Sequence, residues 1–590
     1  MKQFFLLTFL FISSFSLGQN DFLLAENYYQ ESEFEKATQI YKKLYEASPF
    51  NTTYLNRLIS CYQETEQFNI VENLLKSALK ENPEQPFLTV FLGYNYERQQ
   101  QTEIANSYYE IAINAIEKHP NYGEPIANLF KEYNLLDYAI QAYEKAMKNN
   151  IRANYSFQIA QIYGEKGAFE KMFQSYVDLL DKNENYLNPI QAYISKYITD
   201  DSENKNNILF RKTLLRKSAS NPKVVWNVLL SWLFAKQKEY LKAFVQEKAL
   251  VQRNKSNLSD IFNLGLIAFN HEDFDASKEC FDFVLENTLS KEEKLSAILY
   301  TIKILIALKS PESESKFLNV FKIYGENKQT LPIQIEYADY LTFEKNAPEK
   351  AKKILENSLD FADSKFEKAR IKLKLGDILV FTGKFNKALI YFSQIQTELK
   401  NDELAQEARF KVAQTSYFKG DFIWAKAQLK ILKSSTTQLI ANDAVDLFLM
   451  ITDNEPVDSI PSGLIPYAKA GLLAFQNKNT EAINVLSQLI IEFKGQPIED
   501  EALFKQGKLL IKEQEYKKAI TSFEKVIALN PEGILIDDAH YQLAELYNTH
   551  LNNQEKASEY YQKIIFDYSS SIYLVDARNK YRKLRGDHLN

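Results

Sequence analysis

Glycine and proline are scarce in this sequence, which has 16 glycines and 15 prolines among 590 residues. Because both residues interrupt regular structure, their scarcity favours long helices. Hydrophobic residues make up 45% of the chain and charged residues 25%, which argues against intrinsic disorder. A chain of this length exceeds what one hydrophobic core usually serves, so we expect several domains or one extended repeat array.

Cysteine is also rare, with only Cys61 and Cys280 in the whole sequence. In a linear array these residues lie several repeats apart, beyond the reach of a disulfide. We therefore expect both to be buried as small apolar side chains.

Sequence motifs for catalysis and for cofactor binding are missing. The sequence has no G-x-G-x-x-G or Walker A loop, no H-E-x-x-H and no C-x-x-C. The five histidines are not spaced as metal ligands and are predicted to lie at the surface; they are His119, His271, His540, His550 and His588. We expect no catalytic residue, no cofactor, no metal and no enzyme activity.

Two acidic stretches could bind calcium or act in catalysis, but each has a simpler structural interpretation. The segment NHEDFD at 270–275 lacks the glycine and the terminal glutamate of a calcium loop, and it is predicted to be a turn between helices. Asp537 and Asp538 could form a catalytic carboxylate pair. They more simply begin a helix, where negative charge suits the helix dipole.

The net charge is −6, which argues against nucleic acid as the main partner because phosphate binding needs a concentrated basic face. The chain begins MKQFFLLTFLFISSFSLGQN, with Lys2, an apolar run and small residues at Ser16 and Gly18. This is the pattern of a secretory signal peptide over 1–18. We expect export to the periplasm, at the periphery of the outer membrane, and no membrane span in the mature chain.

A repeat of 34 residues is present, since Pro49 and Pro83 are separated by that period. The third unit and the unit near the C-terminus have the same pattern of small and large residues. These residues are Leu92, Gly93, Tyr96, Ala105, Tyr109 and Ala112 in the third unit, and Gly507, Leu510, Ala519, Phe523, Val526 and Pro531 in the later one. The units at 376 and 413 have related patterns.

This pattern has a steric explanation in a pair of antiparallel helices. Gly93 and Gly507 let the first helix approach the second closely, and Ala105 and Ala519 do the same from the second helix. Prolines such as Pro531 end the second helix, because proline lacks an amide hydrogen and clashes with the preceding turn. One pair cannot bury its apolar face alone, so neighbouring pairs must stack.

These residues resemble the tetratricopeptide repeat (TPR) family over most of 21–585. The resemblance implies an all-α fold, a right-handed TPR superhelix (α-solenoid) of antiparallel helix pairs, with about 12–15 pairs. We expect an N-terminal TPR array at 19–180, a degenerate TPR-like array at 181–455 and a C-terminal TPR block at 456–590. The stretches 181–222, 286–330 and 433–466 depart from the pattern; SPESES at 310–315 and prolines 456, 461 and 466 suggest loops there.

The C-terminal block also resembles BamD/YbgF-type periplasmic TPR proteins. The residues that carry this resemblance are DDAHYQLAELYN at 537–548 and EKASEYYQKIIFDYSSSIYLVDAR at 555–578. They contain an acidic residue and alanine at the start of one helix, and the same pair, Asp576 and Ala577, at the next. The resemblance implies work in the bacterial cell envelope.

The same family resemblance predicts a groove lined by first-helix residues that do not face the second helix. Counting from the anchor positions gives eight candidate partner-binding residues. They are Tyr94, Arg98, Phe269, Phe381, Tyr417, Phe418, Lys508 and Lys512. Aromatic and arginine side chains are common anchors of protein interfaces. The paired lysine and asparagine clamp for C-terminal carboxylates is not evident, so an extended C-terminal tail is not the favoured ligand.

We therefore expect a non-enzymatic scaffold or adaptor that binds other envelope proteins, with outer-membrane assembly or secretion as candidate pathways. The alternative is a carbohydrate-binding or uptake accessory protein, since aromatic residues in the groove would suit sugar stacking. Only three tryptophans occur, which weighs against it. The third possibility is an enzyme whose site has no recognisable motif.

Overall fold

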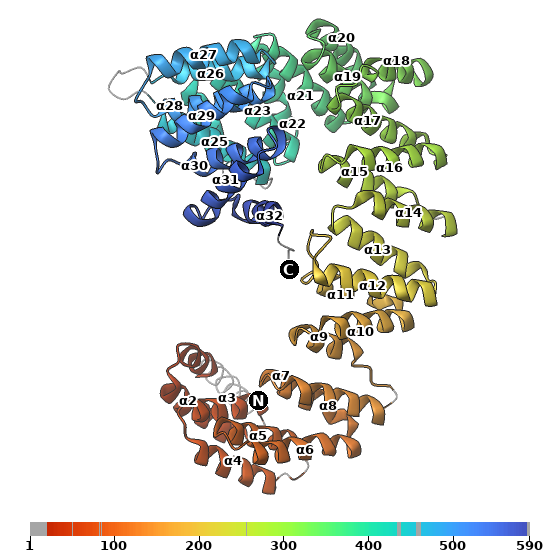
Figure 1. Ribbon diagram of the computed structural model, residues 1–590, viewed down its shortest axis with the longest axis vertical. Coiled ribbons are helices and arrows are strands. Elements are labelled where there is room, and N and C mark those ends of the chain that lie inside the picture. The colour runs from red at the N-terminus through yellow and green to blue at the C-terminus, as the bar shows by residue number, and fades with distance from the viewer. Residues whose placement is uncertain are drawn as a thin grey trace, which may run out of the picture. The chain divides into compact units, whose positions relative to one another are not determined.

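The computed structural model describes residues 21–49, 51–81, 83, 85–150, 152–254, 257–432, 438–455 and 462–586. These residues form helices joined by short turns, and no strand occurs among them. The chain divides into two compact units, one of residues 1–197 and 209–226 and the other of residues 198–208 and 227–590. Within each unit, successive helices pack as antiparallel pairs (Figure 1). The predicted all-α helical-repeat fold is thus confirmed.

The first unit begins with a helix over 21–30. Its further elements are α2 (Phe34–Ala47), α3 (Thr52–Glu64), α4 (Phe68–Glu81), α5 (Phe87–Arg98), α6 (Thr102–Lys118), η1 (Pro120–Tyr122), α7 (Gly123–Glu132), α8 (Leu136–Asn149), α9 (Ser156–Glu165), α10 (Phe169–Lys182), η2 (Glu184–Tyr186) and α11 (Leu187–Ile194). Two helices contribute to both units, α12 (Lys205–Ser220) and α13 (Val224–Lys236).

The second unit continues with α14 (Tyr240–Asn254), α15 (Ser259–Asn270), α16 (Phe274–Asn287), α17 (Lys291–Ala307), α18 (Ser313–Tyr324), η3 (Lys328–Thr330), α19 (Leu331–Phe343), α20 (Pro348–Ser358), η4 (Leu359–Phe361), α21 (Lys365–Phe381), α22 (Phe385–Glu398), α23 (Glu403–Lys419) and α24 (Phe422–Leu432). Its C-terminal part contains α25 (Gln438–Asp453), α26 (Leu464–Phe475), α27 (Asn479–Glu492), α28 (Ile498–Lys512), α29 (Tyr516–Leu529), α30 (Ile536–Glu545), the π-helical turn η5 (Leu546–His550), α31 (Gln554–Asp567) and α32 (Leu574–Arg585).

Glycines in the first helices are covered by an aromatic ring from the second helix. A Cβ atom added to Gly93 would lie 2.3 Å from the Tyr109 ring, and one added to Gly376 would lie 2.3 Å from the Phe392 ring. Both distances are far below van der Waals contact, so no larger residue fits without a shift of the helices. The steric role predicted for the small residues is therefore confirmed.

The turn inside most helix pairs contains one residue with a left-handed backbone. Such residues recur every 34 positions at Ser32, Glu66, Gln100 and Asn134 in the first unit. The interval widens to 37 at Lys309, Asn346, Gly383 and Gly420 in the second unit. A single left-handed residue costs little for glycine and is tolerated by asparagine, which explains the two residue types that recur in the later turns.

The predicted helix ends are confirmed, because α2, α4 and α29 stop two residues before Pro49, Pro83 and Pro531. The expected loop at 310–315 is only half correct, because α18 already begins at Ser313, whose hydroxyl donates to the Ser310 carbonyl. Pro466 is not in a loop but in the first turn of α26, where the missing amide hydrogen has no helical partner to lose. Prolines 456 and 461 lie outside the described residues.

Burial of the cysteines is confirmed, since Cys61 and Cys280 are both fully buried and unbridged. The candidate signal peptide at 1–18 lies outside the described residues. Among the residues that are described, no helix combines the length and the apolar character needed to cross a membrane.

Candidate interaction surface

The first helices of successive pairs pack against one another in the second unit. Helix α21 contacts α19 and α23, and α26 contacts both α23 and α28. The intervening helix α25 packs on α24 and α23. Residues of the first helices that do not face their own second helix therefore meet side chains from the neighbouring repeats, and they form the candidate surface.

A series of ion pairs joins first helices of adjacent repeats, and we call it the charge ladder. Each pair joins an acid to a base 31 to 35 residues later, which is about one repeat. The pairs are Glu26 with Arg57 at 2.7 Å, Asp339 with Lys374 at 2.5 Å, Asp377 with Lys411 at 3.0 Å and Glu545 with Lys580 at 2.7 Å.

The acid of every ladder pair directly follows the small residue of its helix. The four small residues are Ala25, Ala338, Gly376 and Ala544. Because that residue faces the second helix, the next side chain points about 100° away from it, toward the neighbouring first helix. The repeat register thus fixes where each acid lies.

Lys374 lies between two ladder acids, Asp339 and Asp377. Burial lowers the pKa of its ammonium group, but the two carboxylates outweigh burial and raise that pKa above the ordinary value. The ammonium group therefore stays charged, and the half-buried pairs fix the register of α19, α21 and α23 more than they add to stability.

Further along the same surface, aromatic and charged side chains from α23, α26 and α28 come together, and we call them the aromatic–charge cluster. Its members are Tyr417, Phe418, Tyr467, Gly471, Glu501 and Lys505. The Lys505 Nζ atom lies 4.5 Å from the centre of the Tyr467 ring, a distance typical of a cation–π contact. Tyr417 is only 3% exposed, and its hydroxyl has no hydrogen-bond partner among the described residues.

Two charged groups of the cluster have strongly shifted pKa values. Burial, and then the nearby charge of Asp500, raises the pKa of Glu501 to about 7. Burial lowers the pKa of Lys505 to about 8, although Glu501 opposes that change. Shifts of this size mark groups that lack full compensation in the folded protein, and such groups are common at functional sites.

The predicted residues Tyr94 and Arg98 lie on α5 and already have partners within the first unit. The Tyr94 ring stacks on Tyr133 with 3.8 Å between ring centres, and Arg98 pairs with Glu64 at 2.7 Å. Arg98 is exposed and Tyr94 is half-buried, so both retain surface that a partner could contact.

Two other predicted residues contribute mainly to packing. Phe269 is half-buried, and its ring contacts Phe274 and Tyr300 edge to face. Phe381 is 8% exposed and packs on Phe343, so its side chain lies in the core and is not presented on a free surface.

Four predicted residues lie in or beside the aromatic–charge cluster. Tyr417 and Phe418 belong to it, although burial places the Tyr417 ring in the core. Lys508 and Lys512 are exposed on α28, and the Lys508 Nζ lies 5.5 Å from the Phe504 ring centre. The structure thus brings Tyr417 and Phe418 to the same surface as α28.

Sequence reasoning did not identify Tyr467, Glu501 or Lys505 as site residues. A signal was available, since Glu501 follows Tyr467 by 34 residues and Lys505 follows Gly471 by 34. Gly471 directly follows the small residue of its helix, and Lys505 stands two residues before the small residue of the next first helix; comparing these two positions between adjacent repeats would have placed them together.

The expectation that all histidines lie at the surface is wrong for His540. This side chain is 5% exposed and is packed near the rings of Tyr560 and Tyr568. Burial lowers the pKa of His540 to about 4, so the ring is neutral at pH 7. No group of histidine, cysteine and acidic residues that could hold a metal occurs in the described part of the chain.

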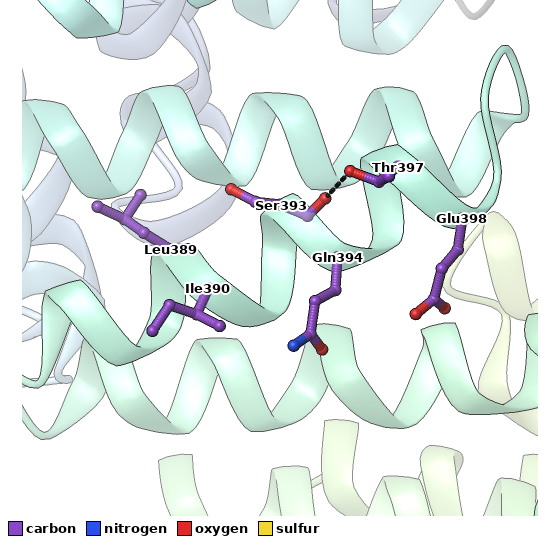
Figure 2. A pocket seen from close by; sticks show the side chains of 6 residues that line it. All are labelled: Leu389, Ile390, Ser393, Gln394, Thr397 and Glu398. Atoms are coloured by element: carbon purple, nitrogen blue, oxygen red, sulfur yellow. Dashed lines mark hydrogen bonds between the residues drawn. The ribbon is translucent and has the colours of Figure 1, made fainter.

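A recess of about 470 Å³ lies along α22 (Figure 2). Figure 2 shows its six lining side chains, Leu389, Ile390, Ser393, Gln394, Thr397 and Glu398, all from that helix. The Thr397 hydroxyl donates to the Ser393 carbonyl, and Glu398 pairs with Lys372. None of the six is aromatic, so the recess does not favour the sugar-stacking alternative.

The fold and the surface together define a helical-repeat protein with a charged and aromatic face on its first helices. Two stretches, 500–532 and 538–571, match the family described as tetratricopeptide repeat. They coincide with the pairs α28–α29 and α30–α31. Tetratricopeptide repeats typically serve as interaction scaffolds, and neither match is to a catalytic family. No curated protein matches the sequence significantly.

Solved structures of low similarity also match. A chain of the structure of Naa15/Naa10 bound to HypK-THB is 12% identical, with 96% of this chain and 97% of that chain covered and a TM-score of 0.28. Yeast Tom70 is 12% identical over 74% and 96% of the two chains, with a TM-score of 0.31. PilW, a type IV pilus biogenesis factor, is 14% identical over 42% and 100%, with a TM-score of 0.26. Similarity this low indicates nothing about function.

Proposed function

We propose that this protein is a non-enzymatic scaffold or adaptor that binds other proteins of the cell envelope. The surface of first helices in the second unit, including the aromatic–charge cluster, is the proposed binding face. The observation that carries this proposal is the cluster itself, where the buried Tyr417 hydroxyl has no hydrogen-bond partner among the described residues and burial strongly shifts the pKa values of Glu501 and Lys505. Such groups gain free energy when a partner supplies the missing contact.

The position of the cluster also suits a protein ligand. Its rings come from α23 and α26 and its charged groups from α28, so an elongated segment could contact several repeats at once. Tyrosine and phenylalanine bury large areas at interfaces, and lysine over a tyrosine ring adds a directional contact. Stacked repeats offer extended surfaces of this kind, whereas a small-molecule site is usually a deep pocket.

The proposed location is the periplasm, at the periphery of the outer membrane, with outer-membrane assembly or secretion as the candidate pathways. This part of the proposal is supported by the leader-like pattern of residues 1–18 and by the resemblance of 537–578 to periplasmic TPR proteins. Fractionation of cells that express the full chain tests it, and retention of the protein in the cytoplasm would contradict it.

A photo-crosslinking experiment tests the binding face. We would place p-benzoylphenylalanine at Phe418, which is half-buried in the cluster, and at Phe566 as the matched control. Phe566 is 68% exposed on α31, the second helix of its pair. We expect crosslinks to a small set of envelope proteins from position 418 and not from position 566. Identical products at both positions, or turnover of generic ester, phosphate or peptide substrates by the purified protein, would contradict the proposal.

A further inference from the structure

Lys505, in the second unit, lies at the position of a base in the charge ladder, but a glycine occupies the position of its acid. Lys505 stands two residues before Gly507, as Lys374 stands before Gly376 and Lys411 before Ala413. Its ladder partner should directly follow the small residue Ala470 of α26. That position is Gly471, 34 residues before Lys505, and glycine has no side chain to pair with.

The local geometry shows that the missing acid would have been within reach. A Cβ atom added to Gly471 would lie 3.3 Å from the Lys505 Nζ atom and 3.3 Å from the Phe418 ring. Within the described residues, the Nζ atom has no ion pair or hydrogen bond, and its contact is with the Tyr467 ring. Glu501 attracts the ammonium group from the preceding turn of α28 but is not paired with it. The charge ladder therefore has no ion pair between Gly471 of α26 and Lys505 of α28.

A second donor faces the same place. The Tyr417 ring edge lies 3.8 Å from the Cβ position of Gly471, and its buried hydroxyl has no partner within the described part of the chain. The Tyr417 hydroxyl is buried, whereas Lys505 is only part-buried, so Lys505 is the donor that a partner can reach. The Lys505 ammonium group makes no ion pair within the described residues, and a charge-assisted hydrogen bond to an anion would supply one.

We propose that Lys505 binds the side-chain carboxylate of an aspartate or glutamate from a partner protein, which takes the place that Asp339 and Asp377 take at the other steps. This inference rests on the proposed scaffold function and names the chemistry of the partner at that face. The Lys505 ammonium group lies over the Tyr467 ring, and the half-buried Phe418 ring beside Gly471 would contact the apolar part of the incoming segment.

A single carboxylate suits the site better than a phosphate. The ladder places one carboxylate oxygen against one ammonium group, as in the pair of Asp377 with Lys411. Asp500 and the partly ionised Glu501 lie on the same helix, and their negative charge opposes a doubly charged phosphate more strongly than a carboxylate.

The experiment uses immobilised full chain and pools of acetylated, C-terminally amidated 12-residue peptides. One pool has a fixed central glutamate, a second has glutamine, and a third has phosphoserine; a fourth has central glutamine and a free C-terminus.

We expect the wild-type protein to retain the glutamate pool about fivefold more than the glutamine pool, in line with one charge-assisted hydrogen bond. The preference should disappear in Lys505→Gln and in Gly471→Asp, which supplies its own acid. It should persist in Gly471→Ala, which adds only a Cβ atom and leaves the place of the carboxylate open.

Several outcomes would overturn the inference. A glutamate preference that survives in Lys505→Gln would show that the carboxylate binds elsewhere. Stronger retention of the phosphoserine or free-terminus pool would show that the ligand class is wrong. Far-ultraviolet circular dichroism checks the fold of each variant, and if both Gly471 variants lose helicity, Lys505→Gln decides the question.

The failure of this site is distinguishable from failure of the scaffold function. If crosslinking at Phe418 captures the same envelope proteins in wild type and in Lys505→Gln with equal yield, the scaffold function stands and the carboxylate site is wrong. If no protein is captured but the glutamate preference follows the predicted variants, the site stands and the proposed envelope partners are wrong.

Discussion

The Lys411 ammonium group lies 3.0 Å from the Asp377 carboxylate, on the next first helix and 34 residues further along the chain. Asp377 has a side chain only 8% exposed and also lies 4.0 Å from Lys374. One buried acid is therefore shared by bases on its own helix and on the following one, and it couples α21 to α23.

Asp377→Asn should destabilise the second unit, because it leaves Lys374 and Lys411 half-buried without full compensation. We expect a loss of about 1–3 kcal/mol in the free energy of unfolding, below the full cost of breaking a buried pair because both lysines are part-exposed. Urea unfolding followed by circular dichroism measures the loss. Asp360→Asn, at an exposed site in η4, is the control and should change stability by less than about 0.5 kcal/mol. Equal effects at both positions would contradict the ladder's role.

Gly376→Ala tests the close approach of paired helices. Alanine normally stabilises a helix by about 1 kcal/mol relative to glycine. Here the new Cβ atom would lie 2.3 Å from the Phe392 ring, so we expect the sign to reverse and a loss of about 1–3 kcal/mol from overpacking. Thermal unfolding of the variant measures the change. An unchanged or raised melting temperature would show that the ring moves aside at little cost.

Features that depend on a single helix pair could be predicted from the sequence, whereas contacts between neighbouring pairs could not. Gly93, Gly376 and Gly507 could be assigned because a close approach within a pair requires a small residue at a fixed position. The pairing of Asp377 with Lys411 could not, since it requires the register between repeats, and that register widens from 34 to 37 residues in the second unit.

The candidate site shows the same division. Tyr417 and Phe418 were identified by counting positions along one helix. Such counting does not show how deeply a side chain is buried, and Tyr417 is buried. Lys505 was missed because its importance comes from Gly471 on the preceding first helix. His540 was misplaced because its burial depends on rings from α31 and from the residue after that helix, which a motif search does not consider.

Protonation of Glu501 should make the stability of the second unit depend on pH. Because burial raises the pKa of Glu501 to about 7, the folded protein binds this proton more tightly than the unfolded chain does. The contribution to stability is therefore complete below the ordinary pKa of 4.5 and is lost as pH rises through about 7. The charges that act on this carboxyl are Asp500 and Lys505 on α28, Asp453 on α25 and Asp538 on α30.

Glu501→Gln should consequently stabilise the protein by about 1–2 kcal/mol at pH 8, after discounting the shift for partial exposure, and have little effect at pH 4. Urea titrations of both proteins at intervals of half a pH unit measure this difference. A difference that is independent of pH would show that Glu501 has an ordinary pKa in the folded protein.

His540 should produce the opposite pH dependence. Burial lowers its pKa to about 4, so the unfolded chain binds the proton more tightly, and stability falls as pH decreases from 6.5 toward 4. We expect a loss of about 2–3 kcal/mol over this range that His540→Phe abolishes, since phenylalanine fits among the same rings and does not titrate. Melting temperatures of the two proteins at pH 7 and pH 4.5 check this. Parallel losses in both would assign the acid sensitivity to other groups.

Gly471→Asp should stabilise the free protein more than Gly471→Asn does. Both substitutions replace a helical glycine, and both new Cβ atoms would meet Lys505 Nζ and the Phe418 ring at 3.3 Å, so propensity and crowding are matched. Only aspartate supplies the carboxylate that Lys505 lacks. We expect an advantage of about 1 kcal/mol for aspartate at pH 7, within the range of a part-buried pair. It should vanish above pH 10.5, where the lysine is neutral in both the folded and the unfolded protein, and it should vanish in the Lys505→Gln background at every pH. An advantage that survives in that background would come from the helix or from Tyr417, and Lys505 would then not be the unpaired base of the ladder.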